Sequence, residues 1–275
     1  MPIAEQIIDE TPDIDVSRRQ DLAAFLRARR DATRPQDVGL AAERGRHVPG
    51  LRREEVAELA QISTTWYTWM EQGREITVSP EVLVQVGRAL NLTPRQVEYM
   101  GILARPAADR RFDIAPDIPE ALRALVQSHQ LAPAYVATPR LDLLVWNDFV
   151  ADAFDYEFTA DALSRNVLWR MFFDPTRRHV YVDWERAAAA AVANFRHVYA
   201  SYRKDPLFAE LLEQLMSSND FARLWSRWDV LSPADMPAFL VRHRTRGICE
   251  LRPVQATLDM APGCFIAVFN CKQIS

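Results

Sequence analysis

The sequence contains few cysteines, and their number is odd. Cys249, Cys264 and Cys271 are the only three, and all lie near the C-terminal end. Secreted domains that depend on disulfides carry paired cysteines in larger numbers. No disulfide framework is therefore expected, and a reducing cytoplasm is the simplest setting for this chain.

Long apolar runs are also absent. Crossing a bilayer takes about 18–20 consecutive apolar residues, and no stretch of the chain approaches that length. The apolar stretch "CFIAVFNC" has the length of a buried strand instead. The opening residues "MPIAEQIIDETPDID" lack the basic start and apolar segment of a secretory signal. We therefore expect a cytoplasmic protein with no membrane partner.

The sequence lacks the common motifs of catalytic and metal sites. It has no Gly-x-Ser-x-Gly elbow, phosphate-binding loop, Cys-x-x-Cys pair or His-Glu-x-x-His helix. The five histidines are scattered, and no two lie three or four residues apart, the helical spacing of paired metal ligands. We predict that the protein is not an enzyme and carries no metal and no cofactor.

Lysine is nearly absent, so arginine supplies almost all the positive charge. Lys204 and Lys272 are the only lysines, and the formal net charge of the chain is −4. Residues 17–115 nevertheless carry a net charge of +3. This excess is mild, so charge alone is weak evidence for a phosphate-binding surface.

The length of 275 residues predicts two domains, at roughly 100–200 residues each. Residues 1–16 form an acidic tail without a basic residue, and residues 17–104 hold five short helical patterns. The proline- and charge-rich residues 105–119 are typical of a linker. Residues 120–275 form the second domain.

Helix-start and helix-end signals organise the first domain. Ser17 is placed to cap its first helix, and Ser79 followed by Pro80 starts a later one. Gly73 is a natural residue to end the helix that begins near Thr64. The pattern predicts a compact all-α domain.

The segment 64–72 is the most informative helix of this domain. At about 100° per residue, Trp66, Tyr67 and Met70 fall on one side, and three threonines with one tryptophan fall on the other. An amphipathic helix and a tight turn precede it, which is the order of a helix-turn-helix whose second helix enters the major groove. Threonines can bond base edges and arginines can meet phosphate. The candidate DNA-binding residues are Arg52, Arg53, Thr64, Thr65, Thr68, Trp69 and Arg74. The spacing alone fits an ordinary helical hairpin with a solvated threonine face equally well.

The second half alternates between strand and helix patterns. "PAYVATPRLDLLVWN" predicts two short strands around a "TPR" turn, and three strand patterns close the chain after several helices. This order predicts an α+β domain with one antiparallel sheet covered by helices.

Longer motifs carry a family resemblance. "LRREEVAELAQISTTWYTWMEQGRE" resembles the helix-turn-helix of xenobiotic-response-element-type (XRE) regulators, and "VPGLRREEVAELA" and "YTWMEQGRE" resemble MmyB-like transcriptional regulators. The segments "RLDLLVWNDFVADAF", "NVLWRMFFDPTRRHVYVDWERAAAAAVANFR" and "DFARLWSRWDV" follow in the order of the MmyB-like ligand-binding domain. The resemblance implies a PAS-like sheet with an apolar pocket for a fatty-acid-like molecule.

Two positions depart from the family pattern. Gln61 stands at the turn between the two helices, where a glycine is usual, and would take the turn geometry at a strain cost of about 1 kcal/mol. Arg244 follows His243, where a proline is usual, so a pocket edge formed by this strand start is in question.

The second domain is rich in aromatic residues that suit either a core or a pocket. The candidate ligand-binding residues are Trp146, Asn147, Phe149, Trp169, Phe172, Trp184, Arg196, Trp225 and His243. The polar members have structural alternatives: Asn147 as a helix N-cap, Arg196 as the partner of a carboxylate such as Asp229, and His243 as a partner of a backbone group.

Two classes of function remain open at this point. The first is a sequence-specific transcriptional regulator that binds double-stranded DNA as a homodimer, and whose second domain senses a small apolar ligand. The second is a protein-interaction adaptor whose second domain is filled by its own side chains. An enzyme fused to a DNA-binding domain is a third reading, which no recognisable nucleophile or acid–base pair supports.

Overall fold

The computed structural model describes residues 13–41, 48–111, 116–154, 163–231 and 235–274. Most of the predicted acidic tail, part of the loop before Val48 and residues 112–115 of the predicted linker lie outside the described residues. The chain divides into two compact units. One comprises residues up to Thr93 together with Met100–Ala107, and the other comprises Pro94–Tyr99 together with the residues from Ala108 onward.

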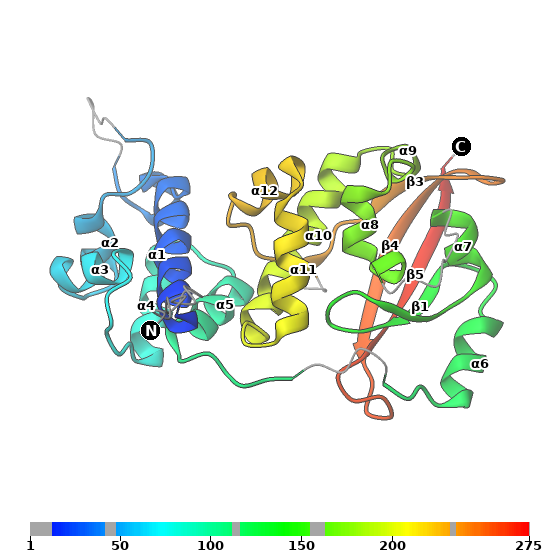
Figure 1. The fold of residues 1–275 in the computed structure, drawn as a ribbon. Coiled ribbons are helices and arrows are strands. Elements are labelled where there is room, and N and C mark those ends of the chain that lie inside the picture. The colour runs from blue at the N-terminus through cyan, green and yellow to red at the C-terminus, as the bar shows by residue number, and fades with distance from the viewer. Residues whose placement is uncertain (1–12, 42–47, 112–115, 155–162, 232–234, 275) are drawn as a thin grey trace, which may run out of the picture. The chain divides into compact units, whose positions relative to one another are not determined.

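The first unit is built from helices, as the sequence predicts (Figure 1). Its elements are α1 (Ile14–Ala32), the short 3-10 helix η1 (Pro35–Val38), α2 (Arg53–Leu59), α3 (Thr64–Glu71), α4 (Pro80–Ala89) and the part of α5 (Pro94–Ala104) from Met100 onward. Phe25, Leu26, Val56, Val86 and Met100 are buried in its core. These apolar positions all follow helical spacing in the sequence.

Capping residues fix where these helices begin. The Ser79 side chain accepts a hydrogen bond from the Val82 backbone N–H, with Pro80 at the first helical position, as predicted. The first helix corrects the prediction, because Asp13 caps it and not Ser17. The Asp13 side chain accepts from the Asp15 N–H at 2.9 Å. The helix therefore begins within the segment predicted as a tail.

Gly50, which comes shortly before α2, lies in close contact with the end of α1. A side chain at Gly50 would collide with the backbone carbonyl oxygens of Arg30 and Asp31. The neighbouring Leu51 N–H donates to the Arg30 carbonyl oxygen at 3.0 Å. Only glycine allows this close approach, which fixes the segment before α2 against the end of α1.

The second unit has an antiparallel sheet of five strands in the order β2-β1-β5-β4-β3. Its strands are β1 (Ala134–Ala137), β2 (Leu143–Trp146), β3 (Phe239–His243), β4 (Gly247–Thr257) and β5 (Phe265–Ile274). Its helical elements are α6 (Glu120–Ser128), α7 (Asp148–Phe154), η2 (Leu163–Arg165), α8 (Val167–Phe173), α9 (Arg177–Val180), α10 (Trp184–Ser201), α11 (Pro206–Met216) and α12 (Asn219–Trp225). The predicted α+β class is confirmed.

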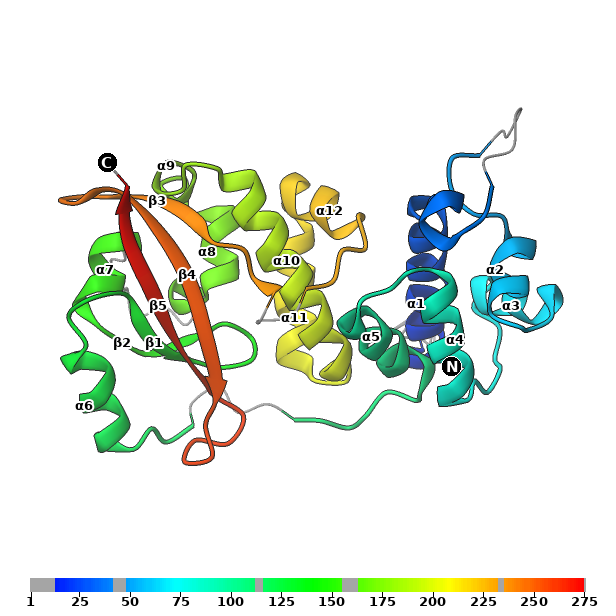
Figure 2. The ribbon, with the colours of Figure 1, turned by 180° about the vertical axis from the view of Figure 1, so that it is seen from behind.

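Most helices of this unit cover one face of the sheet, and α6 packs against the other face at β1 and β2 (Figures 1 and 2). Alternate residues of β1 enter different cores: Tyr135 and Ala137 join the large core formed with α7, α8, α10, α11 and α12, whereas Ala134 and Val136 pack with α6. Because side chains alternate across a strand, a strand covered on both faces is buried throughout. The large core holds the aromatic residues that the sequence analysis singled out.

The "TPR" turn between β1 and β2 forms as predicted and is held by buried polar groups. The Arg140 guanidinium pairs with the Asp142 carboxylate at 2.8 and 3.0 Å, and both side chains are almost fully buried. Asn166, which caps α8, donates from its Nδ2 to Asp142 at 3.0 Å. The turn is therefore tied to the start of α8.

Candidate nucleic-acid interface and ligand cavity

The segment from α2 to α3 forms two helices joined by a tight turn. Gln61 takes a positive φ of 56°, and the Ile62 N–H donates to the Ala57 carbonyl oxygen at 3.0 Å. Ser63 then caps α3 by accepting from the Trp66 N–H at 3.1 Å. The turn geometry forms at Gln61 despite the missing glycine, in a region that disfavours side chains with a Cβ.

The two sides of α3 differ in burial, although less sharply than the wheel predicts, because Thr68 and Trp69 of the outward side are half-buried. Tyr67 and Met70 are buried, and Trp66 is half-buried. Thr64 and Thr65 are exposed at the N-terminal end of the helix. An exposed polar N-terminus on the second helix of such a pair is the part that reaches base edges in helix-turn-helix proteins.

Two other candidates on α3 are engaged within the first unit. The Thr68 hydroxyl donates to the Thr64 carbonyl oxygen at 2.8 Å, so its proton is used inside the helix. Trp69 is half-buried, and the Arg74 guanidinium lies 5.6 Å from the centre of its ring. Arg74 also donates to Gln72 at 2.9 Å. The side chains of Trp69 and Arg74 therefore pack against each other near the C-terminal end of α3.

The two candidate arginines at the start of α2 have different surroundings. Arg52 is exposed, and its backbone N–H donates to Glu55 at 2.6 Å, which closes the N-terminus of α2. Arg53 directs its Nε to the Glu71 carboxylate at 2.7 Å, although its side chain stays 45% exposed. Arg52 is thus an exposed residue at the N-terminus of α2, whereas Arg53 orients α2 against α3.

Glu71 is the residue of this site that the sequence analysis missed. Its side chain is fully buried, and Arg30 of α1 donates to it at 2.6 Å. Burial acts to lower the pKa of Arg30, but the hydrogen bond and charge of Glu71 raise it above its ordinary value. Burial and the same carboxylate raise the pKa of Tyr67 well above its ordinary value. Glu71 follows Tyr67 by four residues, so helical spacing alone places it on the inward side.

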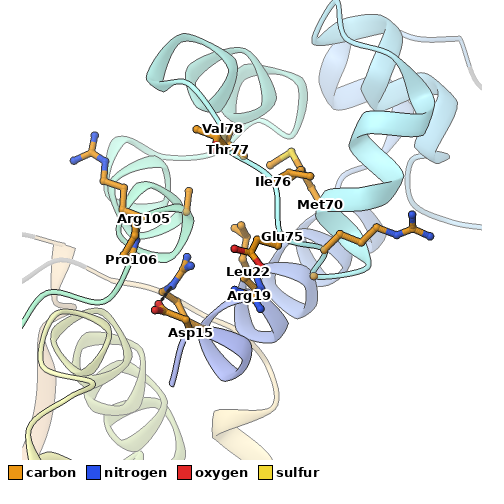
Figure 3. Close-up of a pocket in the computed structure, with 14 residues that line it drawn as sticks. Asp15, Arg19, Leu22, Met70, Glu75, Ile76, Thr77, Val78, Arg105 and Pro106 are labelled. Carbon is orange, nitrogen blue, oxygen red and sulfur yellow. Dashed lines mark hydrogen bonds and ion pairs between the residues drawn. The ribbon is translucent and has the colours of Figure 1, made fainter. Parts of the chain in front are cut away.

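A hollow of about 310 Å³ lies beside this site in the first unit (Figure 3). Asp15, Arg19 and Leu22 of α1 and Ile76 and Thr77, which follow α3, line it. On the same stretch of α1, Arg18 pairs with Asp15 at 2.9 Å and donates to the Leu103 carbonyl oxygen. The bond from Arg18 to Leu103 fastens α1 to the end of α5.

The second unit contains an apolar inner cavity of about 80 Å³. Aromatic and aliphatic side chains from the sheet and from α7, α8 and α10 line most of it, among them Tyr135, Phe154, Met171, Phe239 and Phe269. Two amide side chains, Asn194 and Gln255, also line it. A mostly apolar wall with a small number of polar groups is typical of small-molecule sites.

Family comparisons account for both units. Residues 118–273 match the MmyB-like transcription regulator ligand binding domain, which covers more than half of the chain. The chain belongs to the MmyB-like transcription regulators. Residues 21–100 match a helix-turn-helix domain. The protein is thus a DNA-binding transcription regulator with a ligand-binding domain. A comparison with curated proteins finds no match.

The structure places the nine predicted ligand residues of this regulator outside the inner cavity, since none of them lines it. Trp184 donates from its Nε1 to the Met171 carbonyl oxygen at 3.1 Å, and Phe172 packs edge-on against it with ring centres 5.6 Å apart. Trp169 stacks on Phe173 at 5.2 Å. These aromatic residues pack against each other as core.

The polar candidates largely take the structural roles that the sequence left open. Asn147 accepts from the Val150 N–H at 3.1 Å and so caps α7. His243 accepts from the Thr245 N–H at 3.2 Å, and its ring lies 4.9 Å from that of Phe149. Burial, followed by the charge of Arg246, lowers the pKa of His243 below its ordinary value. Asn147 and His243 therefore stabilise the backbone around β2 and β3.

Arg196 lies between two tryptophans. Its guanidinium carbon is 3.9 Å from the ring centre of Trp225 and 4.3 Å from that of Trp228, and it donates to the Trp225 carbonyl oxygen. Trp146 and Asn147 line a separate hollow at the start of α7. The sequence pattern does not single out Asn194 as a ligand-binding residue. This residue follows Ala187 by seven positions, and both line the inner cavity from α10.

Three further features of the described residues concern membrane spans, metal sites and disulfides. None of the described helices combines the length and apolar character that crossing a membrane requires. Among the described residues, no three histidine, cysteine or carboxylate side chains gather as metal ligands would. The three cysteines, all among the described residues, form no disulfide.

Proposed function

We propose that this regulator reads a specific DNA sequence with the N-terminal end of α3 and that its ligand-binding domain senses a small apolar, fatty-acid-like molecule. In this account the regulator acts as a homodimer in the cytoplasm, on an imperfect palindrome, and has no catalytic role. Helix-turn-helix dimers bind half-sites about one helical turn apart. No metal or cofactor other than the apolar ligand is required.

One observation carries the DNA half of this proposal. The inward side of α3 is fixed by buried Tyr67, Met70 and Glu71, while Thr64 and Thr65 are left exposed at its start. Threonine hydroxyls can bond base edges, and threonine methyl groups can contact the thymine methyl. Exposed Arg52 precedes this helix pair and supplies a charge for phosphate.

The ligand half is supported by the inner cavity. Its lining is mostly apolar and comes from the domain that matches the ligand-binding family. Burial of an apolar molecule there contributes about 25 cal/mol for each Å² of apolar surface removed from water. For the ligand to control transcription, it must bind the DNA-competent and the DNA-incompetent states with different affinities.

The DNA assignment is tested with an operator selected from random DNA. We expect the double variant Thr65→Ala, Trp69→Ala to lose most of its preference for the operator over unrelated DNA. We expect Arg52→Ala to weaken binding to both DNAs alike and to reduce the slope of log affinity against log salt by about 1. Thr77→Ala, at an exposed position after α3, is the matched control. If both variants bind the operator as tightly as the wild-type chain, the groove assignment is wrong.

A further inference from the structure

The ligand-binding domain contains a second space that adjoins the inner cavity. This outer hollow has a volume of about 320 Å³ and is lined by Val198, Leu258 and Phe265, among others. Leu141, Asn194 and Gln255 line both spaces. The inner cavity alone is too small for a typical ligand, but together the two reach the lower range of about 300–1,000 Å³ of known ligand sites.

Asn194 carries a buried acceptor at the junction of the two spaces. The residue is 7% exposed, and among the described residues no donor lies within hydrogen-bonding distance of its Oδ1. Buried polar side chains are nearly always hydrogen-bonded, because an unmet acceptor destabilises the fold. An unmet acceptor that lines two adjoining spaces indicates a partner that is supplied from outside the chain.

Leu141, the second shared residue, is held in a strained conformation. Its φ is 71°, in the left-handed region that leucine rarely adopts. The buried Arg140–Asp142 pair and the Asn166 side chain hold the turn on either side of it. Strain that is maintained by a buried network is characteristic of functional sites. The lining that the two spaces share at Leu141 is therefore held in one shape.

The described lining of both spaces is free of positively charged residues. No arginine, lysine or histidine is among the described residues that line the inner cavity or the outer hollow. The segments 112–115, 155–162 and 232–234, which lie outside the description, contain none of these residues either. Burying an ionised carboxylate without a positive partner is strongly unfavourable. The site is therefore suited to a neutral head group.

We propose that the inner cavity and the outer hollow form one ligand site, and that its ligand is an uncharged amphiphile whose hydroxyl or primary amide bonds to the side-chain amide of Asn194. The hydrocarbon chain fills the apolar lining on both sides of this contact. The hydroxyl or amide N–H of the ligand donates to Oδ1, the buried acceptor that has no donor among the described residues. This inference rests on the proposed sensor function and narrows its fatty-acid-like ligand to an amphiphile with a similar hydrocarbon chain and an uncharged head group.

The test uses the full-length protein and four compounds of equal chain length. Dodecanol and dodecanamide can donate a hydrogen bond, dodecyl methyl ether can only accept one, and dodecanoate is charged. Each compound competes with the neutral dye Nile red at pH 8, and the displacement constant is measured. We expect dodecanol and dodecanamide to bind about tenfold more tightly than the ether or dodecanoate, the effect of one buried hydrogen bond.

Two variants test whether the preference for a hydrogen-bond donor over the ether depends on Asn194. Asn194→Leu removes the acceptor and should bind dodecanol and the ether equally, while retaining affinity for the ether. Asn270→Leu, at an exposed position on β5, is the matched control and should keep the wild-type preference. Circular dichroism checks that each variant is folded. If Asn194→Leu does not fold, the order of affinities of the four compounds for the wild-type chain decides whether the head group is neutral.

The outcomes separate this inference from the proposed function. If dodecanoate binds as tightly as dodecanol, or if Asn194→Leu keeps the preference for dodecanol, the neutral head group at Asn194 is overturned while the sensor function stands. If none of the four compounds displaces the dye, both the site and the proposal of an apolar ligand are overturned.

Discussion

At the scale of single residues, two positions decide how α2 and α3 meet. Gln61 occupies the turn with a positive φ, and Glu71 is buried between Arg30 and Arg53. The strain at Gln61 follows from the sequence, since the family pattern has a glycine there. The role of Arg53 does not follow, because its charge fits a phosphate contact as well as a buried partner.

Replacing Gln61 by glycine should stabilise the helix-turn-helix unit. Glycine adopts a φ of 56° without steric cost, which outweighs its greater freedom in the unfolded chain. We expect a gain of about 0.5–1 kcal/mol in the free energy of unfolding, measured by urea denaturation. Gln72→Gly is the control, because Gln72 has a φ of −93° and glycine there should destabilise. A loss of stability in Gln61→Gly would refute the strain argument.

Replacing Glu71 by glutamine should be strongly destabilising. The substitution leaves the half-buried Arg30 without its buried counter-charge and removes the charge that orients Arg53. Breaking a buried ion pair costs about 3 kcal/mol. Urea denaturation of Glu71→Gln measures the loss, and Glu58→Gln, at an exposed position of α2, should change stability by less than about 0.5 kcal/mol. Equal stabilities of the two variants would show that the Glu71 pair contributes nothing.

At the scale of helices and strands, the sequence predicts most elements and misses what depends on packing between them. Ser79 with Pro80 sets the start of α4, and the strand patterns after residue 236 become β3, β4 and β5. Aromatic content could not separate a core from a cavity, because Trp184 and Phe172 fill space against each other. Asn194 follows the apolar spacing of α10, but only packing shows that its Oδ1 is left without a donor.

The interactions of Asp174 between α8 and α9 predict that the fold loses stability at acidic pH. Burial acts to raise the pKa of Asp174, but hydrogen bonds from Thr176 and Arg170 and the charge of Arg177 lower it from 3.8 to about 2. A lowered pKa means that the carboxylate stabilises the fold above pH 4, and that this contribution is lost as the pH falls from about 4 to 2. Arg170 belongs to α8 and Arg177 to α9, so the interaction fastens two elements together.

The substitution Asp174→Asn tests this interaction. At pH 7 the variant should lose up to about 2 kcal/mol of unfolding free energy. The difference from the wild-type chain should shrink below pH 4 and vanish near pH 2, as followed by urea denaturation across this range. A difference that does not depend on pH would show that the carboxylate charge is not the cause.

At the scale of the whole molecule, the two units assign DNA binding and ligand binding to separate parts of one chain. Family membership shows this division. Sequence motifs predict it because the helix-turn-helix and the ligand-binding segments occur in family order. The PAS-like description, the homodimer and the fatty-acid-like ligand stay predictions. Their tests require DNA and ligand to be present.

The central claim is that the exposed start of α3 lies in the major groove of two half-sites. Methylation interference on the selected operator tests it most directly, since dimethyl sulfate modifies guanine N7 in the major groove and adenine N3 in the minor groove. The account predicts that guanine N7 methylation blocks binding at two positions about 10 base pairs apart. Interference confined to adenine N3, or none at guanine N7 within the operator, would contradict it.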